Sequence, residues 1–464
     1  MLKDIGIFFK PKSIAIVGAS SRAGKPGYEV INNIVANGYE GEVFLVNPKG
    51  GEILGYKVYR SIEALPDGID LAVIILPARD NPVAIRACVR HGIKNFVLAA
   101  GGFKEVDEQG EAIQDEIVRI IEESGIRVIG PNTSGHTSTS WKFTSSFFPL
   151  GKVPHGRVSY VAQTGNFSTH TMRHIITHEH FGVARVIGIG NKLDIDESDA
   201  LEYLVEDDET RAIIMYLESI KNPKRFMEVA DRVTRVKPVI VLKSGRSERG
   251  SKAAVAHTAA MASNDKIIDG TFKQVGITRI YKYSHLIYAG KALSYMPLPN
   301  GNRVSLLAPS GAMLVSLTDF CQNDLGIEVP DLEESSRQKL QDISPDYIRM
   351  RNPVDIWPAA ATHGIESGYG RAMEIVLDDP NIDAVVPVLM LVDRIPIPSM
   401  QFIVDIARKY PEKPIYVTFS GDKKYEEEAK TFLETHGVPT FPMIEEPFEV
   451  LEIMARCRRA MERG

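Results

Sequence analysis

Two stretches of this 464-residue chain repeat one pattern: a short apolar run, a hydroxyl residue, a glycine and then a helix-like run. They cover residues 157–168 and 303–314, 146 positions apart. A second matched pair follows in the same order, residues 238–245 and 414–421, with a spacing of 176. A duplicated α/β domain, with an insertion in the later copy, is the simplest explanation of two matched pairs.

Further apolar runs extend both copies. They lie at residues 185–189 and 212–217 in the first copy, and at 384–390 and 438–441 in the second. Short buried strands separated by helix-length segments are typical of an open parallel sheet. We therefore expect two domains of the flavodoxin type.

The first 140 residues have the same character without belonging to the repeat. Five short apolar runs alternate with helix-length segments, at residues 13–17, 42–46, 71–76, 96–98 and 127–129. This alternation indicates a parallel sheet covered on both faces, and such sheets bind ligands beyond the carboxyl ends of their strands. The sequence thus predicts an α/β fold with a Rossmann-like domain ahead of the two flavodoxin-like domains.

Segments rich in proline and glycine, at residues 148–156 and 296–301, separate the three parts. A chain of this length is too long for one hydrophobic core. We predict domains over residues 1–140, 150–295 and 301–464.

Charge and cysteine content exclude several classes of protein. The formal charge is −6, which argues against general binding of nucleic acid or of an anionic membrane, because both need a basic surface. No apolar run is long enough to span a bilayer, and the first residues make a poor signal peptide. Cys88, Cys321 and Cys457 stand far apart, so neither a disulfide framework nor a metal site is expected. These features favour a cytoplasmic protein with no nucleic-acid partner, membrane contact or bound metal.

The turn after the first apolar run is rich in glycine, with Gly18, Gly24 and Gly27 around Lys25. Small residues at such a turn let backbone N–H groups approach a phosphate. The second run ends at Asn47-Pro48-Lys49, where a NAD-binding domain normally has an acid. A lysine there instead suits an additional phosphate, as in NADP or the 3′-phosphate of coenzyme A. The alternative is that Lys25 and Lys49 are solvated surface residues.

The repeat places Thr164-Gly165 and Ser310-Gly311 at the start of a helix directly after a strand. Each helix N-terminus offers unpaired N–H groups and about half a positive charge. Two such ends facing each other across a pseudo-twofold axis would form an anion site, with phosphate as the obvious anion. The alternative is two glycine turns that only serve chain geometry.

His257 lies among small residues, between Ser251 and Ser263. An imidazole is nucleophilic near neutral pH and can carry a phosphoryl group, provided that an acceptor holds its other ring nitrogen. Glu218, at the end of the run 213–217, is the candidate acceptor. The alternatives are a structural or capping histidine and a surface acid.

Taken in order along the chain, these features resemble the nucleoside-diphosphate-forming acyl-CoA synthetases, relatives of succinyl-CoA synthetase, and in particular the α subunits of ADP-forming acetyl-CoA synthetases. The resemblance covers essentially the whole chain. It is carried by residues 14–20, 77–78, 130–132, 163–166, Glu218, 245–247, 256–258, 310–311 and 352–355.

The resemblance implies that the first domain binds CoA. Acyl-CoA and phosphate would give an acyl phosphate, the phosphoryl group would pass to His257, and His257 would pass it to ADP. Glu218 would orient the histidine, and Asn132 would lie near the thioester. The implied phosphate-binding residues are Gln163, Thr164, Gly165, Asn166, Ser310, Gly311 and Ala312. The implied CoA-binding residues are Gly18, Ser20, Lys25, Asn47, Lys49, Pro77, Ala100, Gly101, Gly102 and Phe103.

The resemblance also implies a partner. The chain has no Walker-type motif, and we expect no ATP-grasp module within it, because the sequence stops at Gly464. The expected partner is an ATP-grasp β subunit that binds ADP or ATP with Mg²⁺, in an α2β2 assembly. One departure concerns the histidine loop, where Ala256 and Ala259 stand in place of the family's usual serine and glycine. Two other functions remain open: a non-catalytic CoA-binding scaffold, and a nicotinamide-dependent oxidoreductase built on the first domain.

Overall fold

The computed structural model describes residues 5–163, 165, 167–250, 252, 264–393 and 395–463. The chain divides into two compact units. Unit 1 contains Met1–His178 and Gly182–Lys282, and unit 2 contains Glu179–Phe181 and Tyr283–Gly464. The units are described separately.

The first sheet of unit 1 has the strand order β3-β4-β2-β1-β5-β6-β7. All neighbouring strands are parallel except β3 and β4. This is the Rossmann order, extended by the short β3 at one edge. The strands are β1 (Ser13–Val17), β2 (Glu42–Val46), β3 (Gly51–Ile53), β4 (Tyr56–Tyr59), β5 (Leu71–Ile74), β6 (Asn95–Leu98) and β7 (Arg127–Ile129). The helices are α1 (Gly6–Phe9), α2 (Pro26–Asn37), η1 (Ile62–Ala64), η2 (Ala78–Asp80), α3 (Asn81–Arg90) and α4 (Glu108–Ser124).

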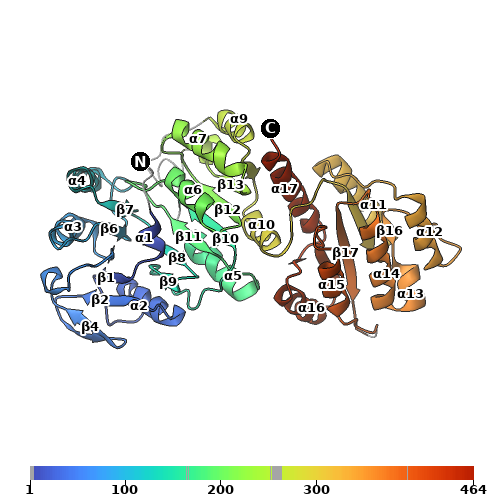
Figure 1. Cartoon of the computed structure of the whole chain (residues 1–464), viewed down its shortest axis with the longest axis horizontal. Helices are drawn as coiled ribbons and strands as arrows, with labels where there is room; N and C mark the ends of the chain where they lie inside the picture. Colours follow the sequence, from blue (N-terminus) through green and yellow to red (C-terminus); the bar gives the residue numbers. More distant parts are fainter. Residues whose placement is uncertain are drawn as a thin grey trace. The chain divides into compact units, whose positions relative to one another are not determined.

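Helices cover both faces of this sheet, with α2 on one side and α3 and α4 on the other (Figure 1). Ile14 and Ile16 of β1 join the core on the α2 side, and Ala15 and Val17 join the core on the α3–α4 side. Because both faces are buried, β1 is a continuous apolar run without alternation. The prediction of this strand and its parallel neighbours is confirmed.

The second sheet of unit 1 has the order β14-β13-β12-β10-β11-β8-β9. Its five parallel strands, β11-β10-β12-β13-β14, follow the flavodoxin order 2-1-3-4-5. The strands are β8 (His136–Ser138), β9 (Phe143–Thr144), β10 (Val158–Ala162), β11 (Arg185–Gly188), β12 (Ala212–Leu217), β13 (Val239–Lys243) and β14 (Thr278–Ile280). The helices are η3 (Phe167–Thr171), α5 (Met172–His178), α6 (Glu197–Glu206), α7 (Pro223–Thr234) and α9 (Asp265–Gln274).

The two sheets of unit 1 share one hydrophobic core. The cluster that contains Phe8 and Phe9 of α1 continues through Val161 and Ile187 of the second sheet. In addition, β8 pairs antiparallel with β11, so the chain enters the second sheet already at His136. This shared core explains why two different sheets form one compact unit.

The sheet of unit 2 is entirely parallel, with the order β16-β15-β17-β18-β19. This sheet also has the 2-1-3-4-5 order. In that order β15 corresponds to β10, and β18 corresponds to β13. These are the strands within the two pairs of repeated sequence. The strands are β15 (Val304–Ala308), β16 (Val354–Asp355), β17 (Ala384–Leu391), β18 (Val417–Gly421) and β19 (Thr440–Phe441). The helices are α10 (Ser284–Tyr295), α11 (Gly311–Asp319), η4 (Phe320–Leu325), α12 (Glu334–Asp342), α13 (Trp357–His363), α14 (Ile365–Asp378), α15 (Gln401–Lys409), α16 (Lys423–Thr435) and α17 (Glu446–Met461).

A buried histidine makes the stability of unit 1 depend on pH. Nε2 of His136 faces the Phe8 carbonyl oxygen, and Nδ1 lies 2.9 Å from Ser145 Oγ. Burial lowers the pKa of His136 from 6.5 to about 4, although the bond to Phe8 acts in the opposite direction. Between those two pH values the unfolded chain binds more protons than the folded chain, so the stability contributed here falls as the pH drops.

We expect His136→Gln to remove about 3 kcal/mol of this acid sensitivity, because each unit of pKa difference corresponds to about 1.4 kcal/mol. Denaturant unfolding from pH 4 to pH 6.5 measures the effect. His178→Gln, at an exposed position, should follow the wild type. Equal pH dependence in wild type and His136→Gln would contradict the prediction.

Candidate active site

A cavity of about 730 Å³ opens where β1, β2 and β5 end. This is the position at which a doubly wound sheet binds ligands. Its lining includes six of the predicted CoA-binding residues: Gly18, Ser20, Lys25, Asn47, Lys49 and Pro77. The wall also contains Arg22 and the first residues of the β3–β4 hairpin, which the sequence analysis did not assign to the site.

Two glycines let the chain close over the end of the sheet. Gly18 has φ +97°, and a Cβ there would lie 2.4 Å from the Ile75 carbonyl oxygen. A Cβ on Gly27, in the first turn of α2, would lie 2.2 Å from the Gly18 carbonyl oxygen. A side chain at either position would therefore push α2 away from the strand end, which is the close approach that such glycines provide.

The polar groups of the cavity suit an anionic ligand. Arg22, Lys25 and Lys49 supply three cations, against one carboxylate from Glu52. The side-chain amide of Asn47 donates to the Ala19 carbonyl oxygen (2.8 Å) and accepts from the Lys49 backbone N–H (2.9 Å). Asn47 thus joins the two loops and holds the start of the Lys49 turn. A cavity of this size and charge fits part of a nucleotide.

The loop Ala100–Phe103 lies elsewhere in unit 1, beyond the end of β6. Glu105 Oε1 accepts the backbone N–H groups of Gly102 (2.8 Å) and Phe103 (3.2 Å). Burial raises the pKa of Glu105, but these N–H donors together with Asn191 outweigh that effect and hold the pKa below its ordinary value. Phe103 itself is buried and does not line the cavity.

Asn132 borders the same loop. It follows β7 with φ +56°, and its backbone N–H donates to the Ala100 carbonyl oxygen (2.8 Å). A Cβ on Gly101 would lie 3.0 Å from Asn132 Oδ1. The predicted thioester residue therefore packs directly against the predicted Gly101-Gly102 turn.

Glu218 follows the last residue of β12, at the carboxyl edge of the second sheet, and its side chain is 7% exposed. The backbone N–H groups of Glu218 and Ser219 both donate to Oε1 of Gln163 (2.9 Å each). The other amide atom of Gln163 donates to Ser219 Oγ (2.9 Å). The Gln163 side chain therefore holds the turn that carries Glu218. A direct contact between Gln163 and phosphate stays a prediction.

Lys192, which the sequence analysis did not identify, also supports this turn. It is buried, has φ +57°, and donates from Nζ to the Ser219 carbonyl oxygen (3.0 Å) and hydroxyl (3.1 Å). Glu197 balances its charge at 3.0 Å. A lysine in an unusual backbone conformation, in a loop after a strand, has no distinctive sequence pattern, so only the fold reveals this role.

The other half of the predicted phosphate site lies in unit 2. Ser310 precedes α11, its side chain makes no capping hydrogen bond, and Gly311 and Ala312 are exposed in the first turn. Gly165 belongs to unit 1, and the one described atom near a Cβ at this position would be Ser134 Cβ, at 3.9 Å. That the two helix ends face each other stays a prediction. His257, Thr164 and Asn166 lie outside the described residues.

Three family models match the chain in succession. A CoA binding domain matches residues 12–138, a succinyl-CoA ligase like flavodoxin domain matches 155–293, and a Ligase-CoA domain matches 304–463. Together with the strand orders, these matches confirm the predicted fold class.

Relatives of known name agree along the full chain. The "Acetate--CoA ligase [ADP-forming] I subunit alpha" of Pyrococcus furiosus is 34% identical over 96% of this chain and 96% of its own length. The chain belongs to the ADP-forming acetate–CoA ligase family. The "Acetate--CoA ligase [ADP-forming] II" of Archaeoglobus fulgidus is 33% identical over 97% of this chain, which spans 66% of that longer protein.

A solved member of the family has the same fold. It is the "dinucleotide forming Acetyl-coenzyme A synthetase 1" of Ca. Korarchaeum cryptofilum, solved in complex with phosphate and ADP. It matches with a TM-score of 0.90 and 31% identity over 99% of this chain and 97% of that one. The resemblance inferred from the sequence is therefore confirmed at the level of the family.

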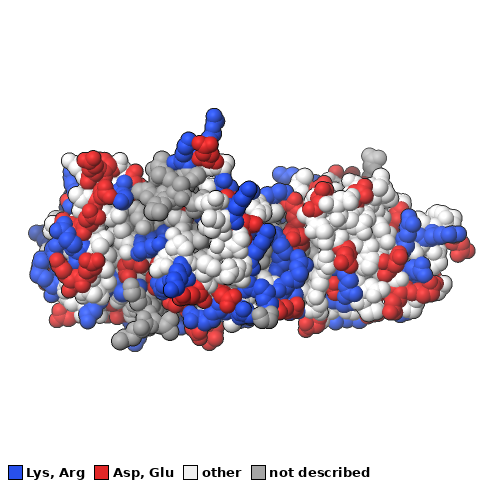
Figure 2. Space-filling view, turned by 90° about the horizontal axis from the view of Figure 1, so that it is seen from above, with Lys and Arg blue, Asp and Glu red and all other residues white. Residues whose placement is uncertain are grey.

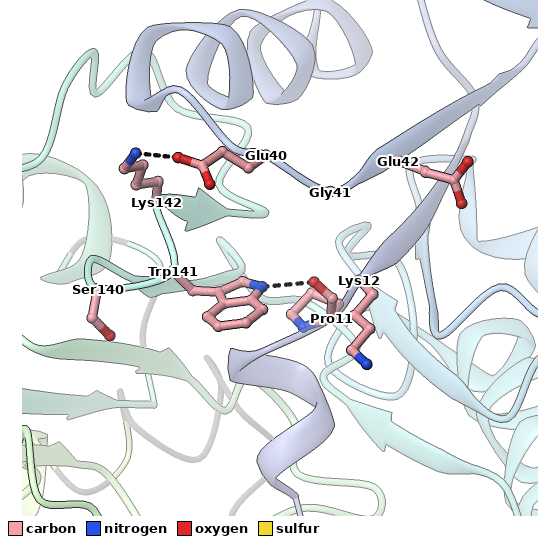
Figure 3. A pocket seen from close by; sticks show the side chains of 8 residues that line it. All are labelled: Pro11, Lys12, Glu40, Gly41, Glu42, Ser140, Trp141 and Lys142. Atoms are coloured by element: carbon pink, nitrogen blue, oxygen red, sulfur yellow. Dashed lines mark hydrogen bonds and ion pairs between the residues drawn. The ribbon is translucent and has the colours of Figure 1, made fainter.

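A second cavity in this ligase family member, of about 340 Å³, lies at the opposite edge of the first sheet, before β1 and β2 begin (Figure 3). The indole N–H of Trp141 donates to the Pro11 carbonyl oxygen (2.7 Å), and Lys142 pairs with Glu40. Its described lining contains none of the predicted site residues that the structure describes. Position therefore favours the cavity at the carboxyl edge as the ligand site.

Basic and acidic side chains both occur across the face shown in Figure 2. Among the described residues, no helix is long and apolar enough to cross a membrane. Within the same ranges, no three histidine, cysteine, aspartate or glutamate side chains form a group that could hold a metal ion.

Proposed function

We propose that this chain is the α subunit of an ADP-forming acyl-CoA ligase that converts acyl-CoA, ADP and phosphate into the free acid, ATP and CoA. The observation that carries the proposal is the buried Glu218 at the carboxyl edge of the second sheet, whose backbone N–H donates to the Gln163 side chain. The proposal is supported by relatives named as α subunits of ADP-forming acetate–CoA ligases.

The proposed reaction has three transfers. An oxygen of inorganic phosphate attacks the thioester carbonyl carbon, the C–S bond breaks, and CoA leaves as a thiolate. A ring nitrogen of His257 then attacks the phosphorus of the acyl phosphate, and the acid leaves as a carboxylate. Finally, a β-phosphate oxygen of ADP attacks the phosphorus on His257, the N–P bond breaks, and the imidazole leaves as ATP forms.

Glu218 has a defined part in this scheme. It accepts the N–H of the second ring nitrogen of His257, which leaves the attacking nitrogen unprotonated and supports the positive charge of the phosphorylated ring. A carboxylate can do this only if it stays in place. Gln163 and Lys192, which hold the backbone of this turn, provide that rigidity.

The first helix turns at Thr164-Gly165 and at Ser310-Gly311 would hold the phosphate, because helix N-termini offer unpaired N–H groups to an anion. The cavity at the end of β1 would hold the nucleotide part of CoA, with Lys25 and Lys49 for its phosphates. The loop Ala100–Phe103 and Asn132 would guide the thioester arm toward the second sheet.

The partner in this proposal is an ATP-grasp β subunit that carries ADP and Mg²⁺, in a cytoplasmic α2β2 assembly. The names of the Pyrococcus furiosus relatives, which are subunits, support a partner. The phosphate and ADP in the Ca. Korarchaeum cryptofilum complex support the two small substrates.

Phosphorylation of the purified chain tests the proposal. We expect acetyl-CoA and ³²P-labelled phosphate to place an acid-labile, base-stable label on His257, and the partner with ADP to remove it as ATP. If a panel of acyl-CoAs leaves the wild-type chain unlabelled, the proposed reaction is wrong.

Lys49 should decide which nucleotide the cavity takes. We expect Lys49→Ala to weaken CoA binding about 10-fold, because a charge-assisted phosphate contact contributes about 1.5 kcal/mol or more. Dephospho-CoA, which lacks the 3′-phosphate, should bind wild type and variant within about twofold of each other. Lys57→Ala, on β4 outside the cavity lining, is the matched control. Calorimetric titration of the wild type and the two variants with CoA, dephospho-CoA and NADP measures these affinities. Binding of NADP without binding of CoA would contradict the assignment of the cavity to CoA.

A further inference from the structure

The loops that follow β7 and β11 lie against each other in unit 1, at the carboxyl edges of its two sheets. The backbone N–H of Asn191 donates to the Pro131 carbonyl oxygen (2.9 Å), and that of Leu193 donates to the Gly130 carbonyl oxygen (3.1 Å). Carboxyl edges are where α/β sheets hold their ligands. These two bonds therefore bring a loop of the second sheet next to Asn132, the residue predicted to lie near the thioester.

Three side chains form a row of hydrogen bonds at this junction. Oε2 of Glu105, from the loop after β6, accepts from Nδ2 of Asn191 (2.8 Å). Oδ1 of Asn191 in turn accepts from Nδ2 of Asn132 (3.4 Å). All three residues are partly exposed. The row thus joins the loops after three strands at a place that a substrate can reach.

The carboxylate of Glu105 fixes the direction of this row. Burial raises the pKa of Glu105, but the backbone N–H donors of Gly102 and Phe103, together with Asn191, hold that pKa below its ordinary value. An ionised carboxylate only accepts hydrogen bonds, so Asn191 must turn its NH₂ group toward Glu105 and its oxygen toward Asn132. Asn132 must then present its own NH₂ group to Asn191.

The oriented amide of Asn132 suits the first transfer of the proposed reaction. Its Nδ2 carries two hydrogens, and Asn191 accepts one of them. The second can donate to the carbonyl oxygen of the thioester, on which negative charge develops as phosphate attacks the carbon. If the amide were turned over, it would present an oxygen there and repel that charge.

We propose that Glu105 and Asn191 are positioning residues of this ligase: they orient the side-chain amide of Asn132 so that it donates to the thioester carbonyl oxygen. This assignment rests on the proposed function. It concerns the acyl transfer alone, because the turn that carries Glu218 is held by Gln163 and serves the later transfers. The two parts of the reaction can therefore be measured apart.

Labelling of His257 from two donors tests the assignment in the full chain. Saturating acetyl-CoA with ³²P-labelled phosphate labels through the thioester. ATP labelled with ³²P at the γ-phosphate, together with the partner subunit, labels by reversal of the last transfer and does not need Asn132. Asn191→Ala removes both side-chain bonds of the row. Asn95→Ala is the matched control, because Asn95 begins β6 at the opposite edge of the first sheet, where its amide donates to the Asp70 carbonyl oxygen (2.9 Å).

We expect Asn191→Ala to lower the rate of labelling from acetyl-CoA about 100-fold, the size expected when a group near the reacting atoms is misplaced. Labelling from ATP and the affinity for CoA should stay within about twofold of the wild type. Asn95→Ala should be labelled from both donors like the wild type. Loss from one donor only is a result that a merely structural asparagine does not give.

Asn191→Asp separates the two bonds of the row. It keeps the oxygen that accepts from Asn132 and replaces the donor to Glu105 with a second carboxylate. Two carboxylates in contact raise the pKa of one of them, so a shared proton restores the missing donor only at lower pH. Relative to the wild type, we expect labelling from acetyl-CoA to be about 100-fold lower at about pH 8 and to recover to within about fivefold at about pH 5.5.

Three results overturn the assignment while leaving the proposed function intact. The first is normal labelling of Asn191→Ala from acetyl-CoA. The second is an equal loss of label from both donors, which would make Asn191 a residue that holds the fold or the Glu218 turn. The third is a ratio of Asn191→Asp to wild type that does not change with pH, which would remove the role of Glu105. A wild type that neither donor labels overturns the proposed function, and the assignment falls with it.

Discussion

His257→Asn should lower ATP formation about 10⁴-fold or more, because the variant lacks the nucleophile through which every phosphoryl group passes. CoA affinity should not change, since the cavity that would bind it lies at the end of the first sheet and its described lining comes from residues 18–77. A coupled assay of ATP formation with the partner subunit measures the first effect, and calorimetry with CoA measures the second.

The matched control is His178→Asn, which removes an exposed histidine at the end of α5 in the same unit. It should retain wild-type turnover. Normal turnover of His257→Asn would mean that phosphate reaches ADP without a histidine carrier. Loss of both ATP formation and CoA binding would mean that the substitution disturbs the fold, and the carrier role would then have no support from this experiment.

Gly311→Val should lower phosphorylation of His257 about 100-fold, because a branched side chain in the first turn of α11 keeps phosphate away from the helix N–H groups. The fold itself does not require glycine there. Among the described residues, a Cβ would meet only Asp355 Oδ2, at 3.5 Å, and Gly311 is not among the glycines with positive φ. Unfolding free energy should therefore change by less than about 1 kcal/mol.

Gly270→Val, in α9, is the control for placing valine on a helical glycine, since no atom of the residues that the structure describes lies within 4 Å of a Cβ there. The measurement is ³²P label on His257 beside denaturant unfolding. If Gly311→Val is labelled like the wild type, the second repeat does not bind the phosphate, and the two-helix anion site is wrong. The same experiment at Gly165, where a Cβ also has room, tests the other half.

The parallel strands could be predicted because each is buried on both faces. Leu71–Ile74 and Ala212–Leu217 are apolar throughout, so a local pattern carries the information. The edge strands β3 and β4 were not predicted, because Gly51–Ile53 and Tyr56–Tyr59 are short and mixed in polarity. Their pairing depends on the neighbouring β2, which no local pattern encodes.

The candidate site was likewise predicted only in part. The glycine turn at Gly18 was predicted from composition, and the structure adds the steric reason, the approach of the Ile75 carbonyl oxygen. Gln163 was predicted as a phosphate ligand, whereas both of its amide atoms are engaged in the Glu218 turn. Lys192 was not predicted, because a lysine in a loop after a strand has no distinctive sequence pattern.

By itself the sequence determined the fold class, the repeat, the family and the residue types at the strand ends. Only the tertiary structure decided which of those polar groups have partners. The physical reason is the distance along the chain over which each feature is encoded. A strand buried on both faces appears as a few consecutive apolar residues, and a glycine turn also involves only neighbouring residues. The charge of Lys192 is balanced instead by Glu197, and its ammonium group donates to Ser219, which comes from a separate segment. Whether a lysine is solvated or paired is settled only when those segments pack together.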